Sequence, residues 1–295
     1  MTAGAHNSSI LRGLGAAIRY QAPILAMVLS MCLGCNSRRG ADRSDLRITT
    51  SASASAPAVT SGASALDRDV VILQVRRAAP SSITIDARLN DAPWSHANDT
   101  GPFSDVTTGI APASTTPRQA HARLLWNETG LWIAFEARCP DVRGTFPRGR
   151  RDSYLWSVQA LEMFFDPDGD NRDYYEIEIN PQNLVFDSFF DAYKRPVVLP
   201  SGPFGHEDWT ADIESAVRID GSLNDSSDRD VGYVVEARIG WKSFAKTERV
   251  PPQSGDTWRM NLYSVERQFA LAWSPILGKG SFHLARRFGR VVFVD

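Results

Sequence analysis

Three glutamates could supply polar chemistry from one surface of this chain. Glu162, Glu176 and Glu178 stand in two segments, residues 160–165 and 174–180, in which hydrophobic and polar side chains alternate. Alternation is typical of β-strands, because successive side chains point to opposite faces. The two segments are therefore predicted to form a β-hairpin that carries the three carboxylates on one face and a hydrophobic surface on the other. That polar face could bind a polar ligand.

A cation is expected beside these carboxylates, because like charges on adjacent strands repel one another. The alternative is that the polar face is simply the solvated side of a sheet. If a cation is present, Ca²⁺ is one candidate. The basic candidates are Arg172, Arg259 and Arg267.

The turn that joins the two segments, residues 166–173, is rich in aspartate, asparagine and glycine. Oxygen ligands at this density could hold Ca²⁺, but the turn departs from an EF-hand loop. Gly169 stands at the fourth position instead of the sixth, and Ile177 occupies the twelfth, where a glutamate is required. A hairpin turn is the preferred interpretation, and the ligands of any structural Ca²⁺ stay unassigned.

Short strands separated by turns predict an all-β domain over residues 70–295, an antiparallel β-sandwich of the jelly-roll or DOMON type with few or no helices. The 295 residues are 43% hydrophobic and 22% charged with a formal net charge of -2, which argues against disorder and against nucleic acid as a partner. The predicted strands are residues 70–75, 82–85, 122–125, 131–137, 160–165, 174–180, 185–190, 211–219, 231–239, 258–265 and 290–294.

The first 35 residues are typical of a bacterial export signal. Their apolar run, residues 24–33, is shorter than the ~20 residues that a membrane-spanning helix needs. The run closes at Leu33-Gly34-Cys35, which resembles a lipobox with Cys35 as the lipidated residue, although Cys32 stands where leucine is usual. An ordinary cleaved signal and an uncleaved anchor are the alternatives. Residues 36–69, rich in serine and alanine, are predicted to be a disordered linker.

A series of phrases extends from residue 83 to the C-terminus. It comprises Ile85-Asp86, Leu89-Asn90-Asp91, Trp94, Leu131-Trp132-Ile133-Ala134-Phe135, Asp152, Trp156, Leu161-Glu162-Met163-Phe164, Asp166, Gly232-Tyr233-Val234-Val235-Glu236-Ala237, Ile239, Trp241-Lys242, Asn261, Trp273-Ser274, Phe282-His283 and Phe288-Gly289. In this order and spacing, the chain resembles the family 9 carbohydrate-binding modules. The resemblance implies a non-catalytic β-sandwich that binds a mono-, oligo- or polysaccharide, aids partner enzymes and often carries structural Ca²⁺.

The resemblance also implies a binding site in which two aromatic rings clamp a sugar and polar side chains bind its hydroxyls. Trp156 and Phe282 are the expected rings. Glu178 stands where sugar-binding members have an arginine. The expected polar contacts are Glu162, Glu178, Asn180, Asn261, Arg151 and Asp152, and a second tier comprises Trp209, Trp273 and His283. Without a ligand, Trp156 could instead seal the edge of the core.

The sequence leaves three other functions as alternatives. A glycoside hydrolase would need two carboxylates across a bound sugar, for which Glu162 and Glu178 are the candidates. Haem binding would need an axial methionine or histidine, but Met163 and Met260 fall on expected core faces. The remaining alternative is an interaction protein of the cell envelope, tethered to the membrane by a lipid anchor, that keeps the fold without binding sugar.

Overall fold

Short β-strands make up almost all of the regular structure. The computed structural model describes residues 70–79, 83–193, 204–267 and 269–295, and within these ranges it contains no α-helix. The strands are β1 (Ile72–Arg77), β2 (Ser104–Asp105), β3 (Gln119–Asn127), β4 (Gly130–Arg138), β5 (Gln159–Asp166), β6 (Arg172–Ile179), β7 (Val185–Ala192), β8 (Ile213–Asp220), β9 (Gly232–Gly240), β10 (Thr257–Glu266), β11 (Phe269–Ala272) and β12 (Gly289–Val294). The 3-10 helices are η3 (Ala92–His96), η4 (Leu155–Ser157), η5 (Trp241–Phe244) and η6 (Ala285–Arg287).

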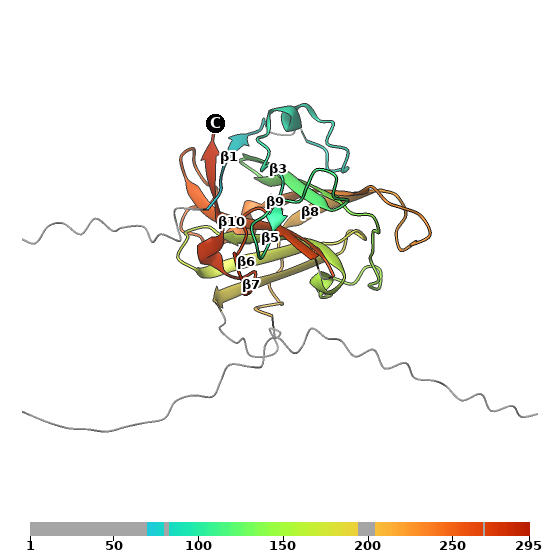
Figure 1. Cartoon of the computed structure of the whole chain (residues 1–295). Coiled ribbons are helices and arrows are strands. Elements are labelled where there is room, and N and C mark those ends of the chain that lie inside the picture. The colour runs from blue at the N-terminus through green and yellow to red at the C-terminus, as the bar shows by residue number, and fades with distance from the viewer. Residues whose placement is uncertain (1–69, 80–82, 194–203, 268) are drawn as a thin grey trace, which may run out of the picture. The chain divides into compact units, whose positions relative to one another are not determined.

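The predicted all-β class is confirmed, with differences in detail. The strands form one hydrogen-bonded path in the order β7-β6-β5-β10-β12-β1-β3-β4-β9-β8, and β11 joins β10 to β2. The path curls so that its two halves lie over one another (Figure 1). Because β1 runs parallel to both β12 and β3, the sheet is mixed. The strand predicted at residues 82–85 is wrong, since residues 83–85 are irregular, and the short strands β2 and β11 were not predicted.

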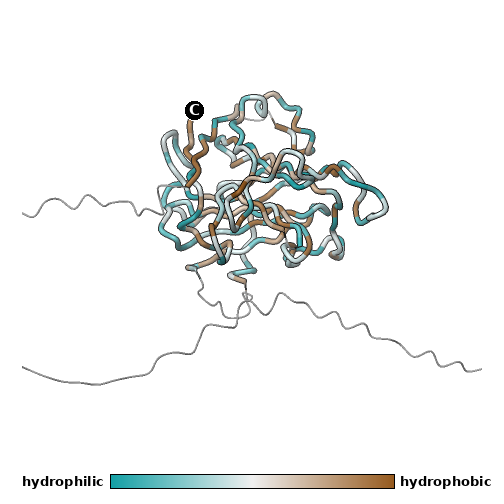
Figure 2. The backbone as a smooth tube through the Cα atoms, in the orientation of Figure 1, coloured by the Kyte–Doolittle hydropathy of each residue, from teal (hydrophilic) through white to brown (hydrophobic). Residues whose placement is uncertain are grey.

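The main core fills the space between the two halves of the sheet. It combines side chains from β3 and β4, such as Leu124 and Ile133, with side chains from β5 and β6, such as Met163 and Ile177. Hydrophobic stretches accordingly run through the strands in Figure 2. Met163 and Met260 belong to this core, as their strand positions predict. No helix in the described ranges is long and apolar enough to cross a membrane.

The predicted hairpin forms from β5 and β6. These strands are antiparallel, with Glu162 opposite Glu178 and Phe164 opposite Glu176. On its other side β5 pairs with β10, which sets Tyr263 opposite Glu162. The hydrophobic face of the hairpin packs into the main core, as predicted. The polar face is not a solvated surface, because its glutamates are buried and Phe164, Tyr174 and Tyr263 on the same face join Phe190 and Phe288 in a second hydrophobic cluster.

Candidate functional site

The three glutamates of the hairpin form a compact buried group, here called the acid triad (Glu162, Glu176 and Glu178). Oxygen atoms from all three carboxyl groups lie within 4.8 Å of one another. Residue exposure is 2% for Glu162, 6% for Glu176 and 0% for Glu178. The spacing follows from the strand register, because directly opposed residues and residues two apart on one strand share a face. Oxygen atoms this close could surround a cation or accept several hydrogen bonds from one ligand.

Burial favours the protonated form of all three carboxyl groups of the acid triad. Loss of water raises the pKa of Glu162 and Glu178 well above their usual range, and the neighbouring carboxyl groups raise both further. Burial also raises the pKa of Glu176, to about 8. The cation expected from the sequence is not among the groups that set these pKa values. Of the expected arginines, Arg259 lies instead at the acidic turn, where its Nη1 donates to Asn171 Oδ1 at 3.4 Å.

His283 is the basic residue that reaches the acid triad. Its Nε2 lies 3.8 Å from Glu176 Oε2, and its Nδ1 is 3.1 Å from the hydroxyl of Tyr174. Burial lowers the pKa of His283 to about 4, although 26% of its side chain stays accessible. The imidazole is therefore neutral at pH 7 and cannot balance a charge on the triad. Together with the accessible part of Glu176, it connects the triad to solvent.

An aromatic group stands beside Glu178. The backbone N–H of Trp156 in η4 donates to Glu178 Oε2 at 3.1 Å. The indole is half-buried and stacks on Tyr154, with ring centroids 4.8 Å apart. Phe204 packs edge-on against both rings, and Phe186 supports them from β7. Tyr154 and Phe204 are 38% and 43% exposed, so this group presents an aromatic surface to solvent.

Phe282 lies on the other side of the triad. Its ring is stacked almost parallel on Tyr263, with centroids 4.4 Å apart, and Tyr263 is the cross-strand neighbour of Glu162. The hydroxyl of Tyr263 donates to the backbone oxygen of Phe282 at 3.0 Å. Trp156 is thus attached to the Glu178 side of the triad and Phe282 to the Glu162 side. The backbone of Trp156 contacts the triad directly and the ring of Phe282 reaches it through Tyr263, but whether the two rings clamp a sugar stays a prediction.

The two expected asparagines are buried and already hydrogen-bonded. Asn261 Nδ2 donates to Tyr263 Oη and to the backbone oxygen of Ser274, and its Oδ1 accepts from the N–H groups of Leu262 and Ser274. Asn180 Oδ1 accepts from two backbone N–H groups of the turn after β6. These bonds hold the strands and loops that carry the site. A direct contact between either asparagine and a ligand stays a prediction.

Arg151 and Asp152 face a different carboxylate. A guanidinium nitrogen of Arg151 forms an ion pair with Asp187 of β7, whose Oδ2 also accepts from the N–H of Ala211. Asp187 is fully buried. Burial, followed by repulsion from Asp187, raises the pKa of Asp152 to about 6. Together, Arg151, Asp152 and Asp187 anchor the loop that leads into η4. This loop in turn sets the position of Trp156.

The second-tier residues divide between two places. His283 lies at the acid triad. Trp273 is 5% exposed in the main core, and Trp209 packs against that core with its ring 5.2 Å from Tyr175. The structure therefore does not bring these two tryptophans to the triad. The alternating pattern of β6 explains why, because Tyr175 points to the face opposite Glu176.

The acidic turn between β5 and β6 forms a second group of acids. Oxygen atoms of Asp166, Asp168 and Asp170 lie within 4.8 Å of one another. Asp166 is buried, and its carboxylate accepts backbone N–H groups from Gly169 and Asn171, both at 3.1 Å. Burial raises its pKa to about 7, while these N–H donors act in the opposite direction. The turn is a hairpin turn, as predicted, that could also hold a metal ion.

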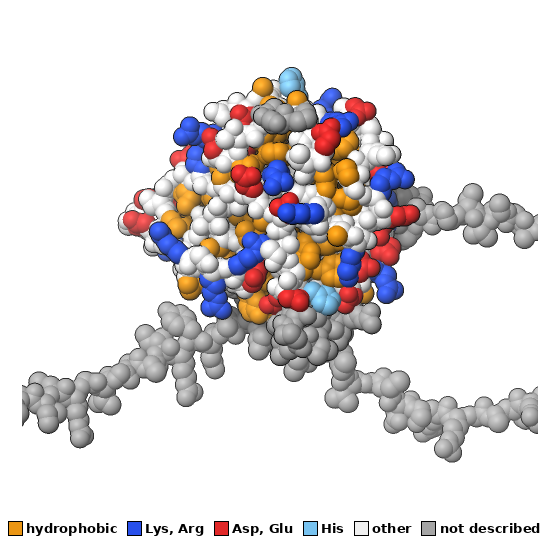
Figure 3. Space-filling view, turned by 180° about the vertical axis from the view of Figure 1, so that it is seen from behind, with side chains coloured by type: hydrophobic (Ala, Val, Ile, Leu, Met, Phe, Trp, Pro, Cys, Tyr) orange, Lys and Arg blue, Asp and Glu red, His pale blue; other side chains and the backbone are white. Residues whose placement is uncertain are grey.

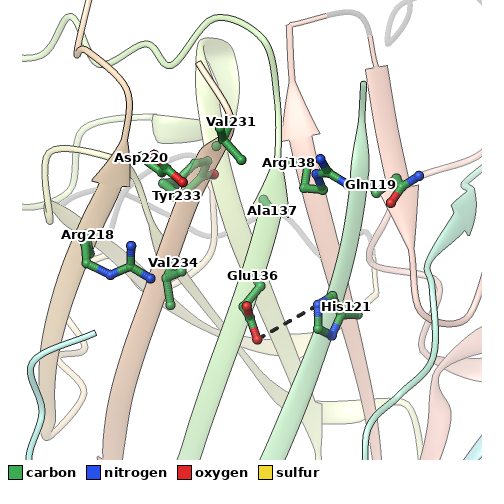
Figure 4. Close-up of a pocket in the computed structure, with 11 residues that line it drawn as sticks. Gln119, His121, Glu136, Ala137, Arg138, Arg218, Asp220, Val231, Tyr233 and Val234 are labelled. Atoms are coloured by element: carbon green, nitrogen blue, oxygen red, sulfur yellow. Dashed lines mark ion pairs between the residues drawn. The ribbon is translucent and has the colours of Figure 1, made fainter. Parts of the chain in front are cut away.

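A separate hollow of about 390 Å³ lies on the outer surface of the other half of the sheet, across β3, β4, β9 and β8. Figure 4 shows polar side chains around it, with His121 and Glu136 pointing toward one another. Their Nε2 and Oε1 atoms are 3.9 Å apart. Arg218 lines the same hollow, but its Nε already donates to the backbone oxygen of Ala87. None of the expected sugar-binding residues lines this hollow.

Comparison with known proteins assigns the chain to a family. The model of the carbohydrate family 9 binding domain-like proteins matches residues 85–295. The chain belongs to this family. No curated protein matches the chain. The family 9 match covers the acid triad, Trp156 and Phe282, and it agrees with the resemblance found in the sequence.

Three solved structures resemble this chain at low sequence identity. A candidate carbohydrate-binding protein from Bacteroides uniformis is 18% identical, with a TM-score of 0.56 over 76% of this chain and 99% of the other. A family 9 module from Caldicellulosiruptor kristjanssonii in complex with cellotriose is 16% identical, with a TM-score of 0.48 over 76% and 94%. The corresponding glucose complex is also 16% identical, with a TM-score of 0.47 over 75% and 95%.

Sequence reasoning missed part of the aromatic surface. The spacing Tyr154-x-Trp156 was a usable signal, because two rings two residues apart in a short 3-10 turn can stack. Phe204 had no such signal, since it joins Trp156 from 48 residues further along the chain. Cys35, the export signal at residues 1–35 and the linker at residues 36–69 lie outside the described residues.

Proposed function

We propose that this family 9 domain binds carbohydrate non-catalytically, at the surface formed by Trp156, Phe282 and the acid triad. The observation that carries the proposal is the partly exposed aromatic stack of Tyr154 and Trp156 in a domain of a carbohydrate-binding family, with the backbone N–H of Trp156 donating to the buried carboxyl group of Glu178. Aromatic faces pack against the C–H groups of a pyranose, while carboxyl groups bind its hydroxyls. The arrangement supplies both kinds of contact side by side.

The chemistry of the triad favours binding over hydrolysis. A glycoside hydrolase needs one protonated and one ionised carboxyl group, which act as acid and as nucleophile or base. Burial raises the pKa of both Glu162 and Glu178, so neither has the environment of an ionised nucleophile. The proposed role is therefore to hold a glycan for enzymes that degrade it.

A structural Ca²⁺ is proposed at the acidic turn. Asp168 and Asp170 are partly or fully exposed there, and Ca²⁺ prefers carboxylate and backbone oxygens supplemented by water. The acid triad fits Ca²⁺ less well, because its three carboxyl groups are buried and the ion requires six to eight oxygen ligands. Bound Ca²⁺ would neutralise the charge of the turn and fix the end of the hairpin.

Export and lipid anchoring through Cys35 complete the proposal. The support is the lipobox-like sequence Leu33-Gly34-Cys35 and the serine- and alanine-rich segment after it, which would let the domain reach outward from a membrane. Metabolic labelling with a tritiated fatty acid tests it in a bacterial host. Label on the wild type that is lost in Cys35→Ala supports the anchor, whereas equal label on both, or none on either, contradicts it.

A glycan-binding screen of the purified protein tests the proposed function. Wild type and Trp156→Ala are compared on neutral, acidic and amino glycans, including glucose and cellotriose, with and without Ca²⁺. Binding of a defined glycan that Trp156→Ala abolishes, with an unchanged circular dichroism spectrum, supports the proposal. Binding of no glycan under any condition contradicts it and favours an envelope protein that uses the exposed rings of Tyr154 and Phe204 to contact another protein.

A further inference from the structure

The acid triad is unusual for a site that would bind only neutral hydroxyl groups. Three carboxyl groups share one buried cluster, and the basic residue that reaches them, His283, is a neutral imidazole at pH 7. Within the described ranges no arginine or lysine forms an ion pair with Glu162, Glu176 or Glu178. In the described ranges the cluster thus holds three carboxyl groups whose ionised forms would have no arginine or lysine to balance them.

A second observation concerns one oxygen of Glu178. The residue is 0% exposed, and its Oε2 accepts the N–H of Trp156. Its Oε1 is inaccessible and has no hydrogen-bond donor in the described part of the chain, other than the carboxyl groups of the triad itself. Buried polar atoms without partners are rare in folded proteins and often mark the position of a missing ligand. Glu176 can donate to this carboxyl group from within the triad, so a ligand would supply the donor that is missing from outside it.

We propose that the acid triad binds the protonated amine of an amino sugar, so that the carbohydrate ligand of this domain carries a free ammonium group. The inference rests on the proposed carbohydrate-binding function and specifies its ligand. An ammonium group has three N–H donors, whereas a sugar hydroxyl has one, so an ammonium matches three carboxyl groups within 4.8 Å of one another. Its charge also favours the ionised form of the carboxyl groups that receive it.

The surroundings suit the rest of such a sugar. Trp156 is joined to the triad through Glu178, and Phe282 through Tyr263 and its neighbour Glu162. Rings on both sides of the triad could contact the C–H groups of the pyranose while its amine reaches the carboxyl groups. The side chains of Glu176 and His283 are 7% and 26% accessible, so the triad is not sealed from solvent.

Calorimetric titration with matched sugars tests the inference. The probes are the trimer of glucosamine, whose amines are free, the trimer of N-acetylglucosamine, whose nitrogens are neutral amides, and cellotriose. Wild type is expected to bind the glucosamine trimer roughly tenfold or more tightly than either neutral trimer, because hydrogen bonds to charged groups are the stronger kind. Glu178→Gln is expected to reduce this preference to within about twofold, because an amide retains shape but not charge.

Glu214→Gln is the matched control. It makes the same change on β8, where the side chain is 64% exposed, and it is expected to leave the preference unchanged. Glu162→Gln repeats the test from the opposite strand in case Glu178→Gln fails to fold. If wild type binds a neutral trimer as tightly as the glucosamine trimer, the inference is overturned while the proposed function stands. If none of the three trimers and no glycan of the screen binds, both fail.

A metal ion is the competing occupant. Calcium chloride is titrated alone into wild type and into Glu178→Gln. Binding that Glu178→Gln abolishes, and that prevents the glucosamine trimer from binding, would assign the triad to a metal and overturn the inference. The inference predicts instead that Glu178→Gln leaves any Ca²⁺ binding unchanged.

Discussion

Glu162 on β5 and Glu178 on β6 are directly opposed across the same hairpin, and both are buried. Two ionised carboxylates at this position would repel one another. Burial favours their protonated forms, and this makes the pairing compatible with folding. Glu176 completes the triad on the same face. The following predictions test what this arrangement, and the residues that support it, contribute to stability and binding.

The stability of the protein should fall as pH rises between about 4.5 and 8. Glu176 has a pKa of about 8 in the folded protein against 4.5 as its ordinary value, so folding favours its protonated form. Its stabilising contribution is present below pH 4.5 and is lost as pH rises through the folded pKa. Glu176→Gln cannot ionise and should be more stable than wild type at pH 8 by on the order of 2–4 kcal/mol.

Urea unfolding of both proteins from pH 5 to pH 8, with EDTA present, measures this effect. The variant should lose less stability across the interval than wild type. Glu214→Gln, which changes an exposed glutamate, should follow wild type at every pH. Parallel pH profiles for wild type and Glu176→Gln would mean that Glu176 is ionised at neutral pH, contrary to this account.

Asn261→Ala should destabilise the fold by about 2–4 kcal/mol, since the buried amide makes four hydrogen bonds and its loss leaves Ser274 groups unpaired. Urea denaturation at pH 7 measures the loss. Ser226→Ala, a change in an exposed loop residue, is the control and should alter stability by less than about 0.5 kcal/mol. An Asn261→Ala variant as stable as wild type would show that these bonds do not support the site.

Arg151→Gln should lower stability by on the order of 1–3 kcal/mol, because it leaves the fully buried Asp187 without its charged partner. The partial exposure of Arg151 keeps this estimate below that for a fully buried pair. Arg150→Gln, at the neighbouring exposed position, is the control. Thermal unfolding at pH 7 compares them, and equal melting temperatures would contradict the role assigned to the Arg151–Asp187 pair.

Trp156→Ala should weaken glycan binding by roughly tenfold or more, because the indole is proposed to supply contact area to the sugar. It should change the stability of the fold little, because the ring is half-buried at the surface. Isothermal titration with the ligand from the screen measures the change. Phe269→Ala removes another exposed ring, on β11, and should bind as wild type does. Equal losses of glycan affinity in Trp156→Ala and Phe269→Ala would contradict this prediction and indicate nonspecific adhesion to aromatic surfaces.

The hairpin was predictable from the sequence because strand alternation is a local signal. Glu162, Glu176 and Glu178 could be assigned to one face, and the hydrophobic residues between them to the other. Burial of that polar face could not be predicted, since Tyr263 of β10 and the segment around Phe282, which pack beside the triad, are distant from the hairpin in sequence. The predicted alternative of a solvated face is thus wrong, because the three glutamates are enclosed, whereas a cation beside them stays a prediction.

Tertiary contacts also decided the roles of the other candidates. Residue type suggested that Asn180 and Asn261 could bind hydroxyls, but their amides are used inside the protein. Trp273 looked like a loop residue and is part of the main core. Acidic, basic and hydrophobic side chains are interspersed over the face seen in Figure 3. Composition alone would not have located a binding surface there.

The most direct test of the central claim is a crystal structure of the protein with the tightest-binding glycan from the screen. The account predicts a sugar ring against Trp156, with its polar groups directed at the acid triad and Phe282 on the far side. A glycan bound in the hollow across β3, β4, β9 and β8, with Trp156 and the triad untouched, would contradict it.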